Sequence, residues 1–371
     1  MKIKSVVAVP ISPPPQQFYG RPNRTALGEV VRVDYGVVKI ETDEGYSGIG
    51  EICTVFTPGG RSLCAQIERY LVPVLLGEDP CQINYLVSAM DEALSGAEPA
   101  KAAIDMALFD IVGKALQTPV YNLLGGMVRE RVPLSHSITY GSSEEMAKFA
   151  VQLAQEGFAT VKVKVGQGLE KDVDAVREIR KAVGPSVRLR VDANMAWATT
   201  KEAIATIRRL EDYDIEIVEQ PVARHALDAM AELRSMTDQP IMADESVWTP
   251  IDAMECIRRD AVDVVSIYVA ESGGLLKAAQ TFSICEAAGI PCLIGSMPET
   301  GIGTAAQIHL GLAMTNLKFD SDVCGVRYFS EDCLTRALKI ENGYAYPPEG
   351  AGLGIDVDEV ILSRWQADVE N

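Results

Sequence analysis

Between residues 126 and 326, short runs of β-branched residues alternate with amphipathic stretches of helical periodicity. Two of the helical stretches begin with the pattern of a capping box, Ser142 with Glu145 and Thr199 with Glu202. Strand-then-helix units repeated this often predict a parallel sheet, and their number suits closure into a β/α barrel. The predicted strands are ATVKVKV (159–165), VRLRVDAN (187–194), IEIVEQP (215–221), QPIMADES (239–246), AVDVVSIYV (261–269) and IPCLIGS (290–296).

The first part of the chain follows a different pattern, in which strands come first and helices later. The segment 30–51 alternates β-branched with polar residues, and its Asp-Glu-Gly supplies the turn of a strand meander. Apolar residues at helical spacing then follow Pro99 over 100–116, and the glycines of LLGG (123–126) end this helical region. This order predicts an α+β arrangement.

We therefore expect two domains. Residues 1–125 are predicted to form an α+β capping domain, and residues 126–326 a barrel of the catalytic type. The tail from about 327 to 371 returns to irregular and strand-like sequence. It is expected to fold back and complete the cap.

Composition and charge narrow the possible partners. The 371 residues carry a formal net charge of −18, which argues against nucleic acid and anionic membranes. The longest apolar runs, such as 71–76 and 290–294, are too short to span a bilayer, and the N-terminal segment 1–15 is more typical of a first strand than of a signal peptide. The eight cysteines lack CxxC or zinc-like spacing, so we expect reduced thiols and a cytoplasmic location.

Three successive predicted strands end in an acidic residue, namely Asp192, Glu219 and Asp244. Because the carboxyl ends of barrel strands meet at one rim, all three carboxylates are expected there. Such carboxylates would repel one another, and a hard divalent cation removes that cost. The absence of a nearby His or Cys favours Mg²⁺ over Zn²⁺. Any one of these acids alone would be better explained as a helix cap or a solvated loop residue.

Two lysines, Lys162 and Lys164, stand two positions apart in VKVKV and therefore point to the same face of their strand. The valines must face the surrounding helices, which directs both lysines into the barrel mouth. Burial and a neighbouring ammonium are then expected to lower one lysine pKa toward the range of a general base. The alternative is an edge strand with a solvated lysine face, which fits poorly with a central barrel strand.

A cation site beside a lysine base suits removal of the proton next to a carboxylate, with the metal stabilising the enediolate. The motifs VKVKV, VDAN, VEQP and ADES, together with TDEGYSGIGE (42–51) and LFDIVGKALQTPVYNLLGG (108–126), resemble the enolase superfamily. The resemblance is to the muconate-lactonizing enzyme subgroup and covers nearly the whole chain. It implies a modified TIM barrel, (β/α)7β, with an α+β capping domain, and Mg²⁺ on Asp192, Glu219 and Asp244.

The same resemblance implies roles for further residues. Lys164 would be the acid/base, with Lys162 assisting it beside the substrate carboxylate. Substrate specificity would come from cap loops around Phe18 to Arg21 and Thr54 to Pro58. The remaining residues expected at or behind the site are Tyr19, Asn194, Glu245 and Glu299.

The sequence departs from the subgroup at Tyr268 in SIYVAESGG, where members usually carry a lysine that faces Lys164. A tyrosine can donate a proton or a hydrogen bond but is a poor base near neutrality. Two-base racemisation is therefore disfavoured, and one-sided chemistry such as syn elimination or cycloisomerisation is expected. Alternatively, Tyr268 is a packing aromatic and another group supplies the second proton.

Asp320 and Asp322 in FDSDVCG stand two apart at the end of the last predicted strand, so both could face the pocket. Similar Asp-x-Asp pairs bind a substrate ammonium group in the dipeptide epimerase branch of the family. Carried over, the pair implies an amino or imino acid substrate. A solvated turn with helix-capping aspartates explains it almost as well.

The leading hypothesis is an Mg²⁺-dependent lyase that dehydrates a small β-hydroxy amino or imino acid, such as a 3-hydroxyproline. The alternatives are an epimerase or racemase of amino acid derivatives or dipeptides, and a muconate-type cycloisomerase. A non-catalytic binding barrel is disfavoured, because all predicted metal ligands and both lysines are present. The expected partner is a small-molecule carboxylate, and the resemblance implies a homo-oligomer.

Overall fold

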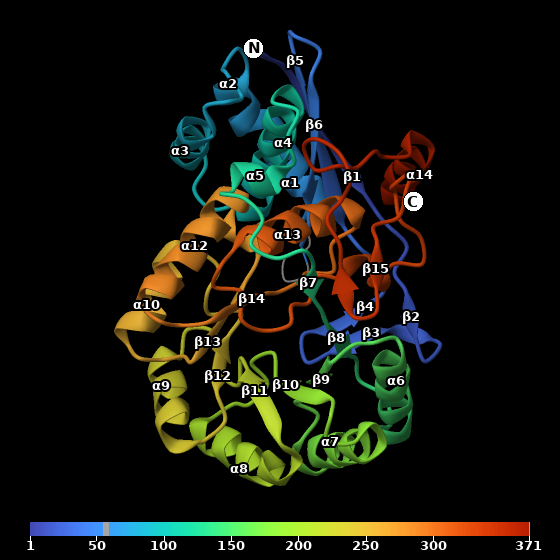
Figure 1. The fold of residues 1–371 in the computed structure, drawn as a ribbon, viewed down its shortest axis with the longest axis vertical. Coiled ribbons are helices and arrows are strands. Elements are labelled where there is room, and N and C mark those ends of the chain that lie inside the picture. The colour runs from blue at the N-terminus through green and yellow to red at the C-terminus, as the bar shows by residue number, and fades with distance from the viewer. Residues whose placement is uncertain (55–58, 371) are drawn as a thin grey trace.

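The computed structural model of the protein describes the backbone of residues 1–54 and 59–370 and the side chains up to residue 366. Two lobes stack along the long axis of the molecule, an upper cap that contains the N-terminus and a lower barrel (Figure 1). The final helix lies beside the cap although it ends the chain. Of the predicted specificity segment Thr54 to Pro58, only Thr54 lies within the described residues.

The barrel is built on seven parallel strands in the order β14-β13-β12-β11-β10-β9-β8. Their β-branched residues pack outward against the helices, as the period-2 pattern predicts. The register pairs Asp192 with both Lys164 and Glu219, so the predicted site residues meet at one rim. The strands are β8 (Ser135–Ile138), β9 (Thr160–Lys164), β10 (Arg188–Asp192), β11 (Ile215–Glu219), β12 (Ile241–Ala243), β13 (Val264–Ile267) and β14 (Cys292–Ile294).

An eighth segment closes the sheet. Leu317 bridges Cys292 of β14, and Ser321 bridges Leu134 just before β8, both in parallel orientation. Backbone bonds from Lys318 to Cys292 and from Ser135 to Ser321 complete the closure. The (β/α)7β architecture expected from the resemblance is therefore confirmed.

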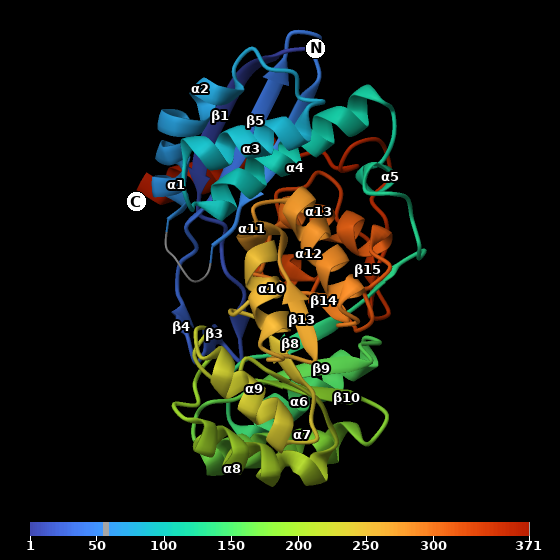
Figure 2. The same ribbon diagram turned by 90° about the vertical axis from the view of Figure 1, so that its left-hand side faces the viewer.

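Helices surround the barrel strands (Figure 2). The capping box predicted at Ser142 and Glu145 is present. At Thr199 the hydroxyl accepts from the amide of Glu202, whereas the Glu202 carboxylate accepts from the Ala198 amide instead of closing the box. The helices are α6 (Ser143–Gln155), α7 (Leu169–Val183), α8 (Thr200–Leu210), α9 (Leu227–Met236), α10 (Pro250–Arg258), α11 (Val269–Ser272), α12 (Leu275–Ala287) and α13 (Gly301–Ala313), with short 3₁₀ turns at Glu211–Tyr213 and Gly325–Tyr328.

The cap contains the predicted meander as an antiparallel sheet of β1 (Ile3–Ile11), β5 (Tyr35–Thr42) and β6 (Ser47–Ile52). Helix α4 (Glu98–Ala115) crosses this sheet closely, because a side chain at Gly50 of β6 would lie 1.9 Å from the Ala103 carbonyl oxygen. The other elements here are α1 (Gly60–Gln66), the π-helical turn Ile67–Leu71, α2 (Val72–Leu75), α3 (Ile83–Ala93) and α5 (Val120–Leu123).

The C-terminal tail divides between the two lobes. Helix α14 (Glu359–Glu370) lies against the cap, where the Ser12 amide donates to the Trp365 carbonyl. The short strands β15 (Ile340–Glu341) and β16 (Tyr344–Ala345) instead pair with β7 (Val132–Pro133) at the barrel. Part of the tail therefore packs against the cap, and part pairs with β7 instead.

Candidate active site

A cavity of about 80 Å³ lies at the carboxyl ends of the barrel strands, under a hairpin from the N-terminal segment. The hairpin consists of β3 (Arg21–Thr25) and β4 (Gly28–Val30), and β2 (Gln17–Phe18) pairs with β3. No cationic residue of the hairpin contributes to the wall. The lining residues are Asn23, Thr25, Leu27, Val30, Ser137, Thr139, Lys162, Lys164, Asn194, Asp244, Tyr268, Ser296, Met297, Pro298, Asp322, Cys324 and Tyr328.

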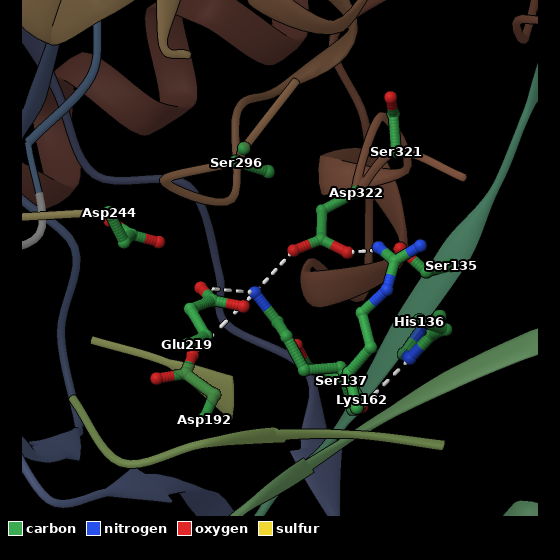
Figure 3. Close-up of polar contacts among 12 residues, drawn as sticks. Ser135, His136, Ser137, Lys162, Asp192, Glu219, Asp244, Ser296, Ser321 and Asp322 are labelled. Carbon is green, nitrogen blue, oxygen red and sulfur yellow. Dashed lines mark hydrogen bonds and ion pairs between the residues drawn. The ribbon is translucent and has the colours of Figure 1, made fainter. Parts of the chain in front are cut away.

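Lys162 stands at the centre of a buried acidic group (Figure 3). Its Nζ lies 3.0 Å from Glu219 Oε1 and 3.6 Å from Asp192 Oδ2, and it also contacts Asp322 Oδ2. Burial alone would lower the pKa of Lys162, but Asp322, Glu219 and Asp192 outweigh burial and raise it well above its ordinary value. The sequence predicted a lowered pKa for one of the two lysines, and Lys162 is not that lysine, because the carboxylates opposite it outweigh its burial.

Lys164 lies nearer the opening, with 14% of its side chain exposed. Its Nζ donates to Asp192 Oδ2 at 2.5 Å and to Asn194 Oδ1 at 2.9 Å. Asn194 has a φ of 41°, a left-handed conformation that asparagine tolerates, and this turns its side chain toward the rim. Its Nδ2 donates to Glu245 Oε1 at 3.0 Å, so Asn194 connects Lys164 to Glu245.

The three strand-end carboxylates are all buried, and a lysine or tyrosine side chain donates to one oxygen of each, while the second oxygen of Asp192 accepts from the Asn194 backbone amide at 2.8 Å. Lys164 donates to Asp192 Oδ2, Lys162 donates to Glu219 Oε1, and the Tyr268 hydroxyl donates to Asp244 Oδ2 at 2.5 Å. Glu219 Oε2 and Asp244 Oδ1 are buried and find no hydrogen-bond partner among the described residues. Such orphaned acceptors are costly unless a cation or a donor reaches them.

The pKa values of these carboxyl groups reflect the same shortage of positive charge around them. Burial, and then the charge of Asp192, raise the pKa of Glu219 well above its ordinary value. Burial and Glu245 raise the pKa of Asp244 to about 7, and burial and Asp192 raise that of Glu245 to about 7. For Asp192, burial is outweighed by Lys164 and Lys162, which hold its pKa below the usual value.

An all-oxygen donor set with two orphaned carboxylate oxygens fits a hard divalent cation by its chemistry. Within residues 1–54 and 59–370, no three acidic, His or Cys side chains are already drawn together as a ligand group. The lysines and Tyr268 hold the carboxylates instead. The oxygen ligands are therefore of the type that binds such a metal ion. To coordinate one ion together, the three carboxylates would have to move away from the lysines and Tyr268.

Tyr268 is the residue that follows β13, and its side chain is buried. Burial and then Asp244 raise the pKa of its hydroxyl well above the ordinary value. The group is therefore a neutral hydrogen-bond donor that lines the cavity.

The paired arrangement expected of Asp320 and Asp322 is wrong. Asp322 lines the cavity, but Ser135 Oγ donates to its Oδ1 at 2.5 Å and Lys162 contacts its Oδ2. Asp320 accepts from Thr160 Oγ1 at 2.8 Å and from Arg188 at 2.5 Å, both at the amino ends of their strands. Two residues along a strand span almost 7 Å, which places Asp320 one layer deeper in the barrel.

The cap residues predicted around the substrate also lie elsewhere. Phe18 is buried beside Phe149 and Tyr328, and Tyr19 packs edge-on against Phe149, outside the cavity wall. Thr54 donates to the Asp34 carbonyl at 3.4 Å and lines a separate surface depression. The hairpin that follows Phe18 and Tyr19 supplies the wall instead.

Glu299 is buried behind the wall rather than at its edge. Its carboxylate accepts from Ser296 Oγ at 2.6 Å and from the Met297 amide at 3.1 Å. Ser296 and Met297 both line the cavity, so Glu299 shapes this loop from behind. Burial is the main cause of its raised pKa.

Several residues that line the cavity were not predicted from the sequence. Ser137 and Thr139 belong to the first barrel strand and its end, a strand that the prediction did not identify. The alternation of Ser135, Ser137 and Thr139 is the signal that could have revealed an inward polar face. Nothing local in the sequence indicates that Asn23, Thr25 and Leu27 reach a barrel more than 100 residues away.

Comparison with known proteins identifies the family. Residues 8–125 match the N-terminal domain of mandelate racemase and muconate lactonizing enzyme, and residues 145–361 match the enolase C-terminal domain-like family. The chain belongs to the mandelate racemase/muconate lactonizing enzyme family of the enolase superfamily. This membership confirms the family and the cap-and-barrel fold expected from the motifs.

Relatives within this family catalyse more than one isomerisation. The chain is 41% identical over 297 residues to a hydrophobic dipeptide epimerase of Enterococcus faecalis, covering 79% of this chain and 83% of the relative. It is 34% identical to muconate cycloisomerase 1 of Rhodococcus opacus, covering 93% and 94%. A structure of the Enterococcus faecalis dipeptide epimerase complexed with Mg and L-Leu-L-Tyr superposes with a TM-score of 0.89 at 37% identity, covering 96% of this chain and 100% of that one.

In the described ranges, no helix is both long enough and apolar enough to cross a bilayer.

Proposed function

We propose that this family member is an Mg²⁺-dependent enzyme that removes the proton next to the carboxylate of a small substrate, with Lys164 as its acid/base. The observation that carries the proposal is the rim itself. There, a partly exposed lysine faces a cavity beside three buried carboxylates, two of which keep an unpartnered oxygen.

Asp192, Glu219 and Asp244 would hold the metal. Their oxygen donors suit Mg²⁺, and the Mg complex of the dipeptide epimerase relative supports the same ion. Bound there, the cation would stabilise negative charge developing on the substrate carboxylate. Asn194 and Glu245 would hold the ligands in place. The Asn194 side chain donates to Glu245, and its backbone amide donates to Asp192 at 2.8 Å.

The two lysines would have different tasks. Lys164 has access to the cavity and would take the α-proton, and its bond to Asn194 would aim its Nζ. Lys162 is held as an ammonium by Asp322, Glu219 and Asp192, because these acids raise its pKa. It would therefore serve as fixed positive charge beside the substrate carboxylate and not as a second base.

The reaction we propose first is dehydration of a small β-hydroxy amino or imino acid, with hydroxyprolines as candidates. Lys164 would take the α-proton and return a proton to the departing hydroxyl on the same face, so water leaves and a carbon–carbon double bond forms. Tyr268 supports one-sided chemistry, because its hydroxyl donates to Asp244 and its pKa is raised. The cavity of about 80 Å³ suits a small substrate, and Asp322 alone could face an amino group.

Epimerisation of a dipeptide or an N-acylated amino acid is the second candidate, and the 41% identity to a dipeptide epimerase favours it. In that reaction Tyr268 would have to donate the second proton. Muconate-type cycloisomerisation is the third candidate, supported by the Rhodococcus opacus relative, and it needs one acid/base group only.

Proton NMR in D₂O with Mg²⁺ tests these candidates on one sample set. The substrates are hydroxyprolines, hydrophobic dipeptides and cis,cis-muconate, each with the wild type and with Lys164→Ala. Loss of water from a hydroxyproline supports the first candidate, whereas α-deuteration with inversion and no dehydration refutes it. Lys164→Ala should lower any true rate about 10³-fold, the scale of general base catalysis. An unchanged rate would reject the role of Lys164.

A further inference from the structure

The β3–β4 hairpin forms part of the cavity wall but has little support of its own. Its residues Asn23, Thr25, Leu27 and Val30 line the cavity, whereas Arg24 and Gly28 are exposed. Among the described residues, its one partner in the sheet is the two-residue strand β2. A three-stranded ribbon this small is marginal by itself, so its position over the cavity must be fixed by contacts with the barrel.

Thr139, which follows β8, makes the principal contact. Its hydroxyl donates to the Arg24 carbonyl at 2.6 Å and accepts from the Arg24 amide at 2.8 Å. The side chain is buried, with 3% exposure, so water cannot readily replace these bonds. The Tyr140 amide donates to the same Arg24 carbonyl at 3.0 Å. One hydroxyl and one amide therefore satisfy both backbone groups of Arg24.

Tyr140 continues the connection into the strand that carries Lys164. Its hydroxyl donates at 2.6 Å to the carbonyl of Val165, the residue after Lys164. The Val165 amide in turn donates to the Asp192 carbonyl at 2.9 Å. Consecutive hydrogen bonds thus run from the hairpin through Thr139 and Tyr140 to the backbone beside Lys164.

A second tie exists at the surface but contributes less. Arg21 forms an ion pair with Glu145 at 2.6 Å, with side-chain exposures of 58% and 36%. Exposed pairs of this kind are screened by water and salt and contribute little. The buried bonds of Thr139 are therefore expected to hold the hairpin.

We propose that Thr139 and Tyr140 are positioning residues that hold the β3–β4 hairpin as a lid over the cavity and fix it relative to Lys164. Thr139 holds the lid to the barrel. Tyr140 joins this contact to the end of β9. The inference deepens the proposed function, on which only its kinetic consequence rests.

Hydrogen–deuterium exchange on the full-length protein tests the lid without any substrate. Thr139→Val keeps the shape of the side chain but loses both bonds to Arg24, and Thr139→Ser keeps the hydroxyl. The peptide covering residues 21–30 should exchange about tenfold faster or more in the valine variant, on the scale of one to two net hydrogen bonds. The serine variant should stay close to the wild type.

Thr206→Val is the matched control. Thr206 is equally buried, and its hydroxyl donates to the Glu202 carbonyl at 2.9 Å within α8, outside the cavity wall. This variant should leave exchange in residues 21–30 unchanged. Limited trypsin digestion gives an independent readout, because cleavage after the exposed Arg24 should accelerate in Thr139→Val only.

The kinetic arm uses whichever substrate the NMR screen identifies. Thr139→Val should raise KM about tenfold with a smaller fall in kcat, and Thr139→Ser should restore both. Tyr140→Phe keeps the amide bond to Arg24 but loses the bond to Val165, so it should lower kcat more than it raises KM. Unchanged exchange and proteolysis in a folded Thr139→Val protein would overturn the proposal, even if the enzyme activity is confirmed. Faster exchange without any detectable activity would reject the proposed function but would still support the role of Thr139 in holding the lid.

Discussion

Two clusters of charge lie in the same barrel, at opposite ends of its strands, and the upper one is largely buried whereas the lower one is partly exposed, with 46% of the Arg188 side chain accessible. In the lower cluster, Asp320 accepts from Arg188, and Glu216 pairs with Arg190 at 2.7 Å. Each carboxylate there faces an arginine, although Arg190 Nη2 finds no acceptor within the described part of the chain. In the upper cluster, by contrast, the carboxylates outnumber the lysines, and Glu219 and Asp244 keep orphaned oxygens.

This difference distinguishes a cluster of paired charges from the proposed metal site. Paired charges hold the folded barrel together, and nothing about them requires a ligand. Unpaired buried carboxylates cost stability, so their retention points to a partner that arrives later. Barrel enzymes place catalysis at the carboxyl ends of the strands and stability at the amino ends, and the two clusters follow that division.

The largest expected effect comes from breaking the upper cluster at Glu219. Glu219→Gln keeps the size of the side chain but removes one charge from the proposed metal site. We expect activity to fall more than 100-fold and the thermal stabilisation by Mg²⁺ to disappear. In the wild type, Mg²⁺ at 100 times its dissociation constant should add about 2.7 kcal/mol to the free energy of unfolding. Calorimetry with and without Mg²⁺, after EDTA treatment, measures this directly, and a wild type that EDTA and Mg²⁺ do not affect would contradict the metal site.

Breaking the lower cluster should act on stability instead. Asp320→Ala leaves Thr160 and Arg188 without their shared acceptor, and Arg188 is partly exposed, so we expect a loss of roughly 1–3 kcal/mol in the free energy of unfolding. Activity at 25 °C should stay within a few-fold of the wild type. Urea unfolding and initial rates test both statements. Lost activity with unchanged stability would instead support a role for Asp320 in substrate binding, as the sequence suggested.

A smaller effect should distinguish a third buried group, His136 of β8, from both clusters. Burial, with Arg327 as a lesser cause, lowers its pKa to about 4. The unfolded chain has a histidine pKa near 6.5 and so binds the proton first. Stability is therefore lost as the pH falls from about 6.5 to about 4, by at most roughly 3 kcal/mol.

The buried carboxyls oppose this trend, because Asp105 has a pKa raised to about 7 by burial and its folded form gains relative stability as the pH falls. The measurement must therefore be a difference. Urea unfolding of the wild type and His136→Asn at pH 7 and pH 4.5 isolates the histidine, and the gap between the two proteins should shrink at the lower pH. A gap that stays constant would show that His136 does not titrate in this range.

The sequence by itself determined the repeating strand-helix units, the capping box at Ser142 and the rim position of Asp192, Glu219 and Asp244. These follow from local periodicity and from the rule that parallel strands end at one edge. The motifs also identified the family. The side-chain periodicity of VKVKV correctly directed Lys162 and Lys164 inward.

Only the tertiary structure decided what surrounds those residues. Whether a lysine pKa rises or falls depends on which charges lie opposite, and Asp322 comes to Lys162 from a segment 160 residues away. The depth of Asp320 depends on the stagger of the closing strand, and the wall of the cavity depends on a hairpin from the start of the chain. Periodicity reports the face on which a side chain lies, whereas its layer in the barrel and its partners are set by the packing of distant segments.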